Sequence, residues 1–110
     1  MSKGKTTSKR ISEAFTRLRK YSCWVGNFNN KRANNPGLKD HPDWLIIKPY
    51  YAIIWVETKI GRDTFSEGQE KLMKMLCWFM GMPKSRVYYY VVTTAEEAEK
   101  LSDRILVNKL

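Results

Sequence analysis

The chain has 110 residues, of which 43% are hydrophobic and 13% aromatic, so it is long enough for one domain with a modest core and too apolar for a disordered tail. Lys and Arg number 20 against 11 acidic residues, and the resulting net charge of +9 favours a polyanionic partner, nucleic acid ahead of a membrane surface. The same charge could serve only to keep the protein soluble. No apolar run approaches the ~20 residues that cross a bilayer, and no apolar region follows the basic start, which excludes a secretory signal.

The cysteine content argues against a zinc site. Cys23 and Cys77 lie far apart, no CxxC motif is present, and the chain has one histidine. This usage fits a reducing compartment, so we expect a cytoplasmic protein, or one in the host cytoplasm if it is viral. Both thiols are expected to act as small core residues.

The N-terminal part predicts a basic arm followed by an amphipathic helix. Residues 1–7 are polar and basic, which predicts a flexible arm, and residues 8–110 then form the domain. Apolar positions recur at helical spacing over residues 8–21. These positions are Ile11, Ala14, Phe15, Leu18 and Ser22, and the opposite face carries Lys9, Arg10, Glu13, Arg17 and Lys20. Glu13 is the only acidic residue of this helix, and an ion pair with Arg17 four residues later accounts for it.

Two loops carry cations that suit a phosphate backbone. Residues 23–39 are rich in Asn and Gly, and apart from a possible short strand at 23–28 they predict a loop. This loop contains Lys31, Arg32 and Lys39, and a second loop near residue 61 contains Arg62. We expect these side chains, with Lys9, Arg10 and Arg17, to contact nucleic acid.

The central part predicts a buried sheet. Residues 44–48 and 51–59 are dense in Ile, Trp, Tyr and Val, with Pro49 at the turn between them. Both segments are apolar on both faces, which predicts a central sheet covered on two sides and hence an α/β fold.

The C-terminal part predicts helix, strand and helix. A capping box of Ser66 and Gln69 begins the first helix, which Gly81 and Pro83 end. Residues 86–93 predict a strand, and Thr94 begins the last helix. The expected inward positions are Leu72, Met73, Leu76, Phe79 and Met80 in the first helix and Ala98, Leu101 and Ile105 in the last.

Two carboxylates and a lysine are predicted to meet at one end of the sheet. Asp43 precedes the first central strand and Glu57 ends the second. Lys59, two residues beyond Glu57, projects from the same face because strand side chains alternate. Hard oxygen ligands favour Mg²⁺ or Mn²⁺ over zinc, and the carbonyl of Thr58, whose side chain points the other way, could add a ligand. A lysine beside such an ion can orient the attacking water and offset charge on the phosphate.

Each of these residues also has a structural interpretation. Asp43 after Pro42 suits a turn, Glu57 and Lys59 suit an exposed strand end, and the capping box alone explains Gln69. The alternative function is therefore a basic nucleic-acid-binding module without catalysis. A third possibility is an interaction protein whose basic face meets an acidic protein.

The ordered pattern resembles the PD-(D/E)xK nucleases, and more closely their small VRR-NUC branch. The elements are Pro42-Asp43, then Glu57-Thr58-Lys59, then Gln69 at the start of the next helix, and the segments RVYYYVV and TAEEAEKL extend the resemblance to residues 11–106. One position departs from the family, which usually has a glycine directly before its PD, where this chain has Asp40 and His41.

The resemblance implies a restriction-endonuclease-like core with a mixed central sheet flanked by helices. It implies a Mg²⁺- or Mn²⁺-dependent DNA endonuclease in which Asp43, Glu57 and the Thr58 carbonyl bind metal, Lys59 is catalytic and Gln69 contacts substrate or metal-bound water. Glu13 matches the acid that the family often carries on its first helix as a metal ligand. It further implies a homodimer acting on branched DNA such as Holliday junctions, in DNA repair or in a virus or phage.

Overall fold

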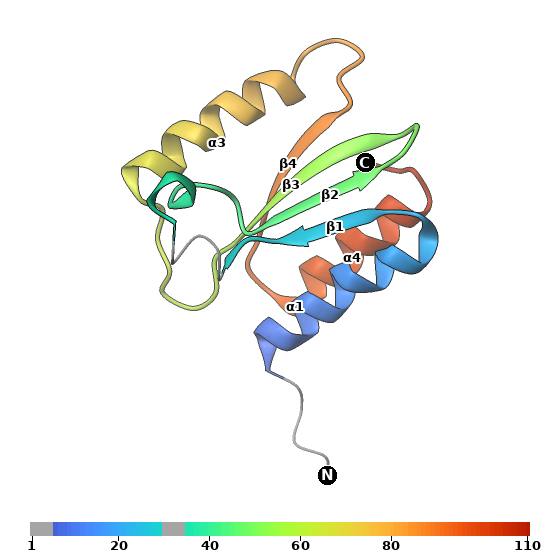
Figure 1. Cartoon of the computed structure of the whole chain (residues 1–110), viewed down its shortest axis with the longest axis horizontal. Coiled ribbons are helices and arrows are strands. Elements are labelled where there is room, and N and C mark those ends of the chain that lie inside the picture. Colours follow the sequence, from blue (N-terminus) through green and yellow to red (C-terminus); the bar gives the residue numbers. More distant parts are fainter. Residues whose placement is uncertain (1–5, 30–34) are drawn as a thin grey trace.

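Four strands form one mixed sheet at the centre of the computed structural model, which describes residues 6–29 and 35–110 (Figure 1). The strands lie in the order β1-β2-β3-β4. The first three are antiparallel and β4 runs parallel to β3. Their bounds are Trp24–Asn27, Trp44–Lys48, Ala52–Thr58 and Val87–Val92. The predicted strands are therefore all present, the short first strand included.

The first helix begins one residue earlier than predicted and changes type before it ends. Thr6 caps helix α1, Thr7–Thr16, by accepting from the Lys9 amide, and the chain continues as the 3-10 helix η1, Arg17–Tyr21. Ser22, expected on the apolar face, is instead exposed with φ of 68°, because the chain turns there to enter β1. Residues 1–5 of the predicted arm lie outside the described part of the chain.

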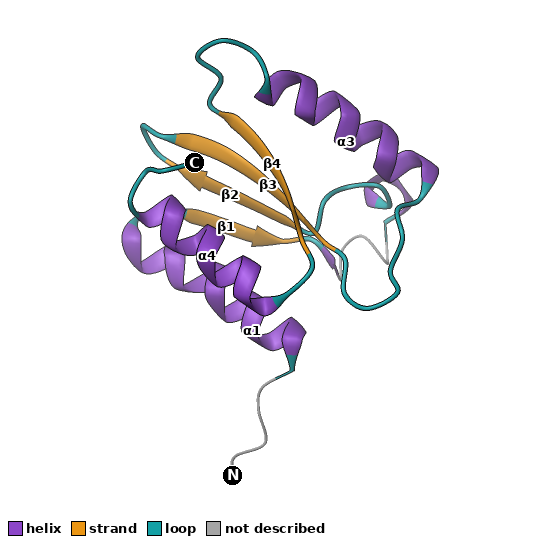
Figure 2. Ribbon diagram, turned by 180° about the vertical axis from the view of Figure 1, so that it is seen from behind, coloured by secondary structure: helices purple, strands orange, loops and turns teal. Residues whose placement is uncertain are grey.

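Helix α1 and the last helix, α4 (Ala95–Leu106), pack together against one face of the sheet (Figure 2). Between them Ser102 is fully buried, and its hydroxyl donates to the Ala14 carbonyl at 2.7 Å. The helices and this face of the sheet share one core, which contains Ile11, Ala14, Phe15, Leu18, Val25, Trp44, Ile46, Ile54, Val56, Val92, Ala98, Leu101 and Ile105.

Helix α3, Glu67–Met80, lies along β4 on the opposite side of the sheet (Figure 1). Its predicted capping box is present: Ser66 Oγ accepts from the Gln69 amide, and Gln69 Oε1 accepts from the Ser66 amide. The helix ends before Gly81, whose φ of −80° is an ordinary right-handed value, so this glycine is not needed for a left-handed turn. In the described part of the chain, no helix is long and apolar enough to span a membrane.

The second face of the sheet is covered only in part, contrary to the expectation of cover on both sides. Helix α3 packs on β4, whereas Trp24 on β1 and Ile53 on β3 remain 53% and 39% exposed. The helix buries none of its described residues, and Phe79, expected to face inward, is exposed. Cys77 on α3 is also exposed, so only Cys23 fills the core position predicted for both thiols.

Candidate active site

Asp43 and Glu57 lie side by side at one end of the sheet. In the antiparallel pairing of β2 and β3, Trp44 is opposite Val56, and continuing this register by one residue places Asp43 opposite Glu57. Both side chains are almost fully buried, with 1% and 2% exposure. Because burying a carboxylate is unfavourable unless it is paired, such a pair needs nearby donors or cations.

Thr58, which follows Glu57 at the end of β3, supplies two donors to Asp43. Its Oδ2 accepts from the Thr58 amide at 2.8 Å and from the Thr58 hydroxyl. The Thr58 side chain was expected only to point away from the site, so its hydroxyl contact with Asp43 is a finding that strand alternation does not predict. These two bonds fix the loop before β2 to the end of β3.

Lys59 and Gln69 complete the site from the loop after β3 and from the first turn of α3. The Lys59 ammonium lies 3.6 Å from Glu57 Oε1, so the two side chains share one face as predicted. It donates to Gln69 Oε1 at 2.9 Å and to the Thr64 carbonyl at 3.1 Å. Gln69 in turn donates through Nε2 to Glu57 Oε1 at 3.3 Å. The Lys59 ammonium and the Gln69 amide therefore both lie close to Glu57 Oε1.

Two aromatic rings bound this cluster. The Lys59 ammonium lies 4.9 Å from the centroid of Phe65. Burial raises the pKa of Tyr89 far above its ordinary value, and the carboxylates of Glu57 and Asp43 raise it further. Neither ring was assigned to the site from the sequence, because Phe65 ends a predicted loop and Tyr89 lies in a strand whose aromatic residues are equally well explained as core.

The donor set fits a hard divalent cation. Two adjacent buried carboxylates offer oxygen ligands of the kind that Mg²⁺ and Mn²⁺ prefer, and such ions keep several positions for water and substrate. Among the described residues, no group of three or more His, Cys, Asp or Glu side chains is arranged to hold a metal. The acidic part of the site thus consists of Asp43 and Glu57.

Glu13 is not brought to this pair. It is exposed and lines a separate hollow between α1 and α4 together with Arg10, Arg17, Glu99 and Asp103. The residues of α1 that lie near Thr58 are Ser8, Ile11 and Ser12, on a different side of the helix. The face of α1 on which Glu13 lies therefore meets α4 and not the end of β3.

Two of the arginines predicted to contact nucleic acid form ion pairs with α4. Arg10 donates to Glu99 at 3.1 Å and to Glu96 at 3.3 Å, and these contacts raise its pKa above the ordinary value. Arg17 donates to the Ser102 hydroxyl at 2.9 Å and pairs with Asp103. The sequence indicated a basic face, but the acids of α4 were too distant along the chain to be recognised as its partners.

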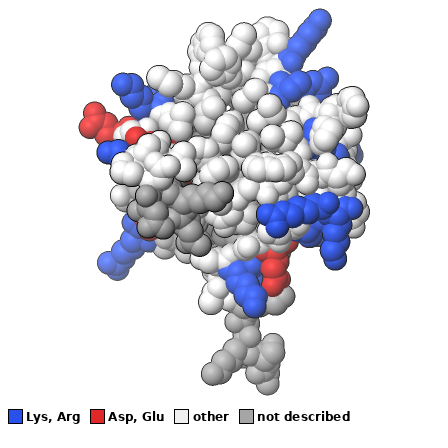
Figure 3. Space-filling model, in the orientation of Figure 1, with Lys and Arg blue, Asp and Glu red and all other residues white. Residues whose placement is uncertain are grey.

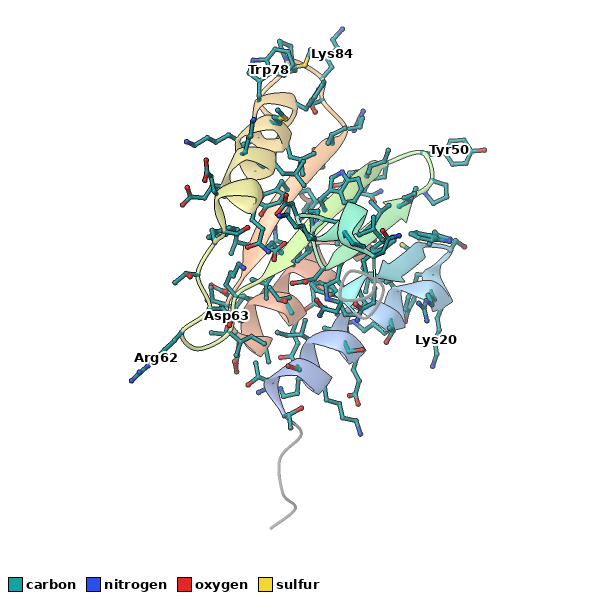
Figure 4. All side chains as sticks on the ribbon, turned by 60° about the vertical axis from the view of Figure 1, so that its left-hand side comes forward. Lys20, Tyr50, Arg62, Asp63, Trp78 and Lys84 are labelled. Atoms are coloured by element: carbon teal, nitrogen blue, oxygen red, sulfur yellow. The ribbon has the colours of Figure 1, made fainter. Side chains whose placement is uncertain are left out.

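The remaining predicted cations are either exposed or lie outside the described residues. Lys9 and Lys39 are exposed, and Lys39 shares a hollow of about 690 Å³ with Gln69. Arg62 projects into solvent from the loop that follows β3 (Figure 4). Lys31 and Arg32 lie outside the described residues.

A contact between the loop before β2 and helix α3 was not predicted from the sequence. The carboxylate of Asp40 packs against Gly68, so closely that a Cβ atom at residue 68 would lie 2.2 Å from Asp40 Oδ2. Next to it, the His41 ring lies between Phe28 and Trp55, with centroid separations of 4.3 and 4.9 Å. Asp40 and His41 stand where the family pattern usually has a glycine before its PD. Asp40 is thus held against α3, and His41 is held between two aromatic rings.

The fold has a counterpart among solved structures. A structure described as a VRR_NUC domain matches this chain with a TM-score of 0.62 and 21% sequence identity, and the match covers 90% of this chain and 97% of that one. No family model and no curated protein matches the sequence. The chain has the restriction-endonuclease-like α/β fold of a VRR_NUC domain, as the resemblance predicted.

Proposed function

We propose that this protein is a Mg²⁺- or Mn²⁺-dependent DNA endonuclease that hydrolyses phosphodiester bonds, with branched DNA such as Holliday junctions as the preferred substrate. The observation that carries the proposal is the pair of buried carboxylates, Asp43 and Glu57, met by Lys59 and Gln69 at the end of the sheet. Burying two acids side by side has no evident structural benefit, because apolar residues of similar size would pack there at lower cost.

Each residue has a role that follows from its contacts. Asp43 and Glu57, with the Thr58 carbonyl, would hold the divalent ion. When bound, such an ion polarises the phosphate and lowers the pKa of the attacking water. Lys59, held by Gln69 and Thr64, has its ammonium group where it can orient water and offset charge on the phosphate oxygens. Gln69 fixes the positions of Lys59 and Glu57.

Substrate binding would rely on exposed cations and on shape. Lys9, Lys39 and Arg62 are exposed, and a net charge of +9 favours a phosphate backbone at every sequence. Contacts of this kind position DNA without reading bases, which suits selection by DNA structure. A role in repair or in a viral life cycle, inside the cell, accords with this activity.

We also propose that the protein acts as a homodimer through α3. Met75, Trp78 and Phe79 on this helix, and Met82 just after it, are 45–66% exposed, although other apolar residues of the same helix already face β4. A helix that is apolar on both sides is normally buried on both. An apolar surface of this kind suits a protein partner better than DNA, and a two-fold pair would present two sites to two strands.

Cleavage of labelled DNA tests the proposed activity. A four-way junction, a flap, a duplex and a single strand are each incubated with Mg²⁺, Mn²⁺ or EDTA. We expect cutting in either metal and none in EDTA, with the junction cut fastest. Lys59→Met should lower the rate at least ~100-fold while DNA binding persists. Lys100→Met removes an exposed charge from α4 and serves as the matched control, which should cut normally.

The outcomes separate the two functions. If the wild-type protein binds all four substrates but cuts none of them in either metal, the protein is a non-catalytic nucleic-acid-binding module. The dimer is tested independently by sedimentation: Trp78→Glu should give monomers, whereas Tyr21→Glu, at an exposed aromatic residue away from α3, should not.

A further inference from the structure

The turn between β2 and β3 presents a tyrosine in an unfavourable conformation. The Tyr51 amide donates to the Lys48 carbonyl at 3.0 Å and closes a four-residue turn with Pro49 and Tyr50 at its centre. Tyr50 has φ of 65°, in the left-handed region, and at this third position of the turn glycine or asparagine is the usual residue. A side chain that carries a Cβ atom is strained there.

Nothing within the described chain compensates that strain. The Tyr50 side chain is fully exposed, at 108% of its reference area, and projects away from the sheet (Figure 4). The ring gains no packing and no burial from the fold. A residue that is both strained and fully exposed is more easily explained by a contact made outside the chain.

The residues on both sides of Tyr50 are held firmly. The Lys48 ammonium donates to the carbonyls of Ile105 and Leu106 at 2.8 and 3.0 Å, where α4 ends. The Tyr51 hydroxyl accepts from the Leu110 amide at 2.7 Å. The tip is therefore a fixed platform, and a ring presented on it loses little conformational freedom when it binds a partner.

The surroundings favour a nucleic acid as that partner. Tyr50 and Arg86 line one hollow of about 290 Å³, and the Arg86 side chain is exposed. Lys and Arg side chains lie along the right-hand edge of the molecule, toward which the turn points, and others lie on the left-hand edge (Figure 3). An exposed ring beside a cation is the combination by which proteins bind single-stranded nucleic acid, because the ring stacks on a base and the cation meets a phosphate.

The turn lies at the opposite end of β2 and β3 from the proposed catalytic residues. The seven residue steps from Tyr50 to Glu57 span about 23 Å at the rise of a strand. A stacked nucleic-acid strand covers this distance in roughly seven nucleotides. We propose that Tyr50 stacks on an unpaired base of the DNA, roughly seven nucleotides from the scissile phosphate, and so helps to select branched substrates; this inference rests on the proposed nuclease function.

Binding measured in EDTA tests the contact without cleavage. The probe is a flap whose unpaired strand carries 2-aminopurine at successive positions, and the proteins are the full-length wild type, Tyr50→Gly and Tyr50→Phe. Tyr50→Gly should weaken binding roughly 5- to 150-fold, the range for loss of one stacked base, and should abolish the fluorescence quenching at one position. Tyr50→Phe should bind within about twofold of the wild type.

Stability supplies a second readout. Because glycine relieves the left-handed strain and no packing is lost, Tyr50→Gly should raise the unfolding temperature. Ser22→Gly is the matched control: Ser22 has φ of 68° and is exposed, so its replacement should relieve similar strain and leave DNA binding unchanged.

Three results would overturn the inference. They are unchanged binding by Tyr50→Gly, equal losses in the glycine and phenylalanine variants, and a change in sedimentation mass, which would assign the ring to a protein contact. Failure of the nuclease proposal looks different: the wild type would bind and quench but not cut in Mg²⁺ or Mn²⁺. Normal cutting by a Tyr50→Gly protein with unchanged affinity would instead leave the nuclease proposal intact and remove the stacking contact.

Discussion

The side-chain amide nitrogen of Gln69 lies 3.3 Å from Oε1 of Glu57, so a residue that caps helix α3 also contacts a buried carboxylate of β3. From the sequence, capping and a role at the site were competing explanations of Gln69. The structure accommodates both, because Oε1 accepts from Ser66 and Lys59 while Nε2 faces Glu57. The start of the helix is thereby tied to the proposed centre.

The double role of Gln69 can be separated from simple capping. Both Ser66→Ala and Gln69→Ala break the capping box, and each should destabilise the protein by about 1 kcal/mol in urea unfolding. Only Gln69→Ala also removes the side-chain amide that contacts both Lys59 and Glu57, so its cleavage rate should fall a further ~10- to 100-fold. Equal rates in the two variants would reduce Gln69 to a capping residue.

The Thr58 hydroxyl should strengthen metal binding through its hydrogen bond to Asp43. Thr58→Val keeps the shape of the side chain but removes the hydroxyl that donates to Asp43 Oδ2. We expect ~10- to 100-fold weaker binding of Mn²⁺ in calorimetry, with Thr58→Ser close to the wild type. If valine binds Mn²⁺ as well as threonine does, the hydroxyl contact has no part in holding Asp43 for the metal.

The close contact with Asp40 is predicted to favour glycine over alanine at residue 68. In the first turn of an isolated helix, alanine would be preferred to glycine, by up to about 1 kcal/mol. Here the added methyl group would overlap the Asp40 carboxylate, which is the end of a half-buried side chain and can shift, so Gly68→Ala should lose that preference and destabilise the protein by up to about 1 kcal/mol.

A double-mutant cycle in urea unfolding checks this explanation. With Asp40→Ala in place the overlap disappears, and Gly68→Ala should then be neutral or stabilising. The same destabilisation in both backgrounds would show that Asp40 is not the cause.

Glu97 is predicted to make stability depend on pH. The Thr93 amide and hydroxyl donate to its carboxylate at 2.6 and 2.8 Å, and the amide contact in particular lowers the pKa of Glu97 below its ordinary 4.5. The ionised form therefore stabilises the fold above pH 4.5, and this contribution is lost as the pH falls through the lowered folded-state pKa.

Glu97→Gln should accordingly lower the free energy of unfolding at pH 7, by only about 0.5 kcal/mol because the group is solvent-exposed. The difference from the wild type should shrink as urea unfolding is repeated toward pH 3. Asp63→Asn, in an exposed loop, is the control and should show no such trend. A constant difference at both pH values would mean that the charge of Glu97 plays no part.

The sequence determined the local elements because their signals lie within a few residues of one another. The Ser66–Gln69 capping box, the helical spacing of Ile11, Phe15 and Leu18, and the apolar strands are each set by neighbouring residues. Alternation along β3 likewise placed Glu57 and Lys59 on one face. Asp43 could be assigned to the same end of the sheet because a short turn dictates the pairing of β2 with β3.

Only the tertiary structure decided how distant segments meet. Arg10 and Arg17 pair with acidic residues of α4 that lie more than 80 residues away in the sequence. Asp40 contacts Gly68, which is also too far along the chain for a local sequence pattern to predict. The position of Glu13 depends on which side of α1 turns toward α4 and which toward β3. The spacing of apolar residues shows that a helix has an apolar face. The partners of its polar residues depend instead on how the helix packs, and this packing is decided by the whole chain.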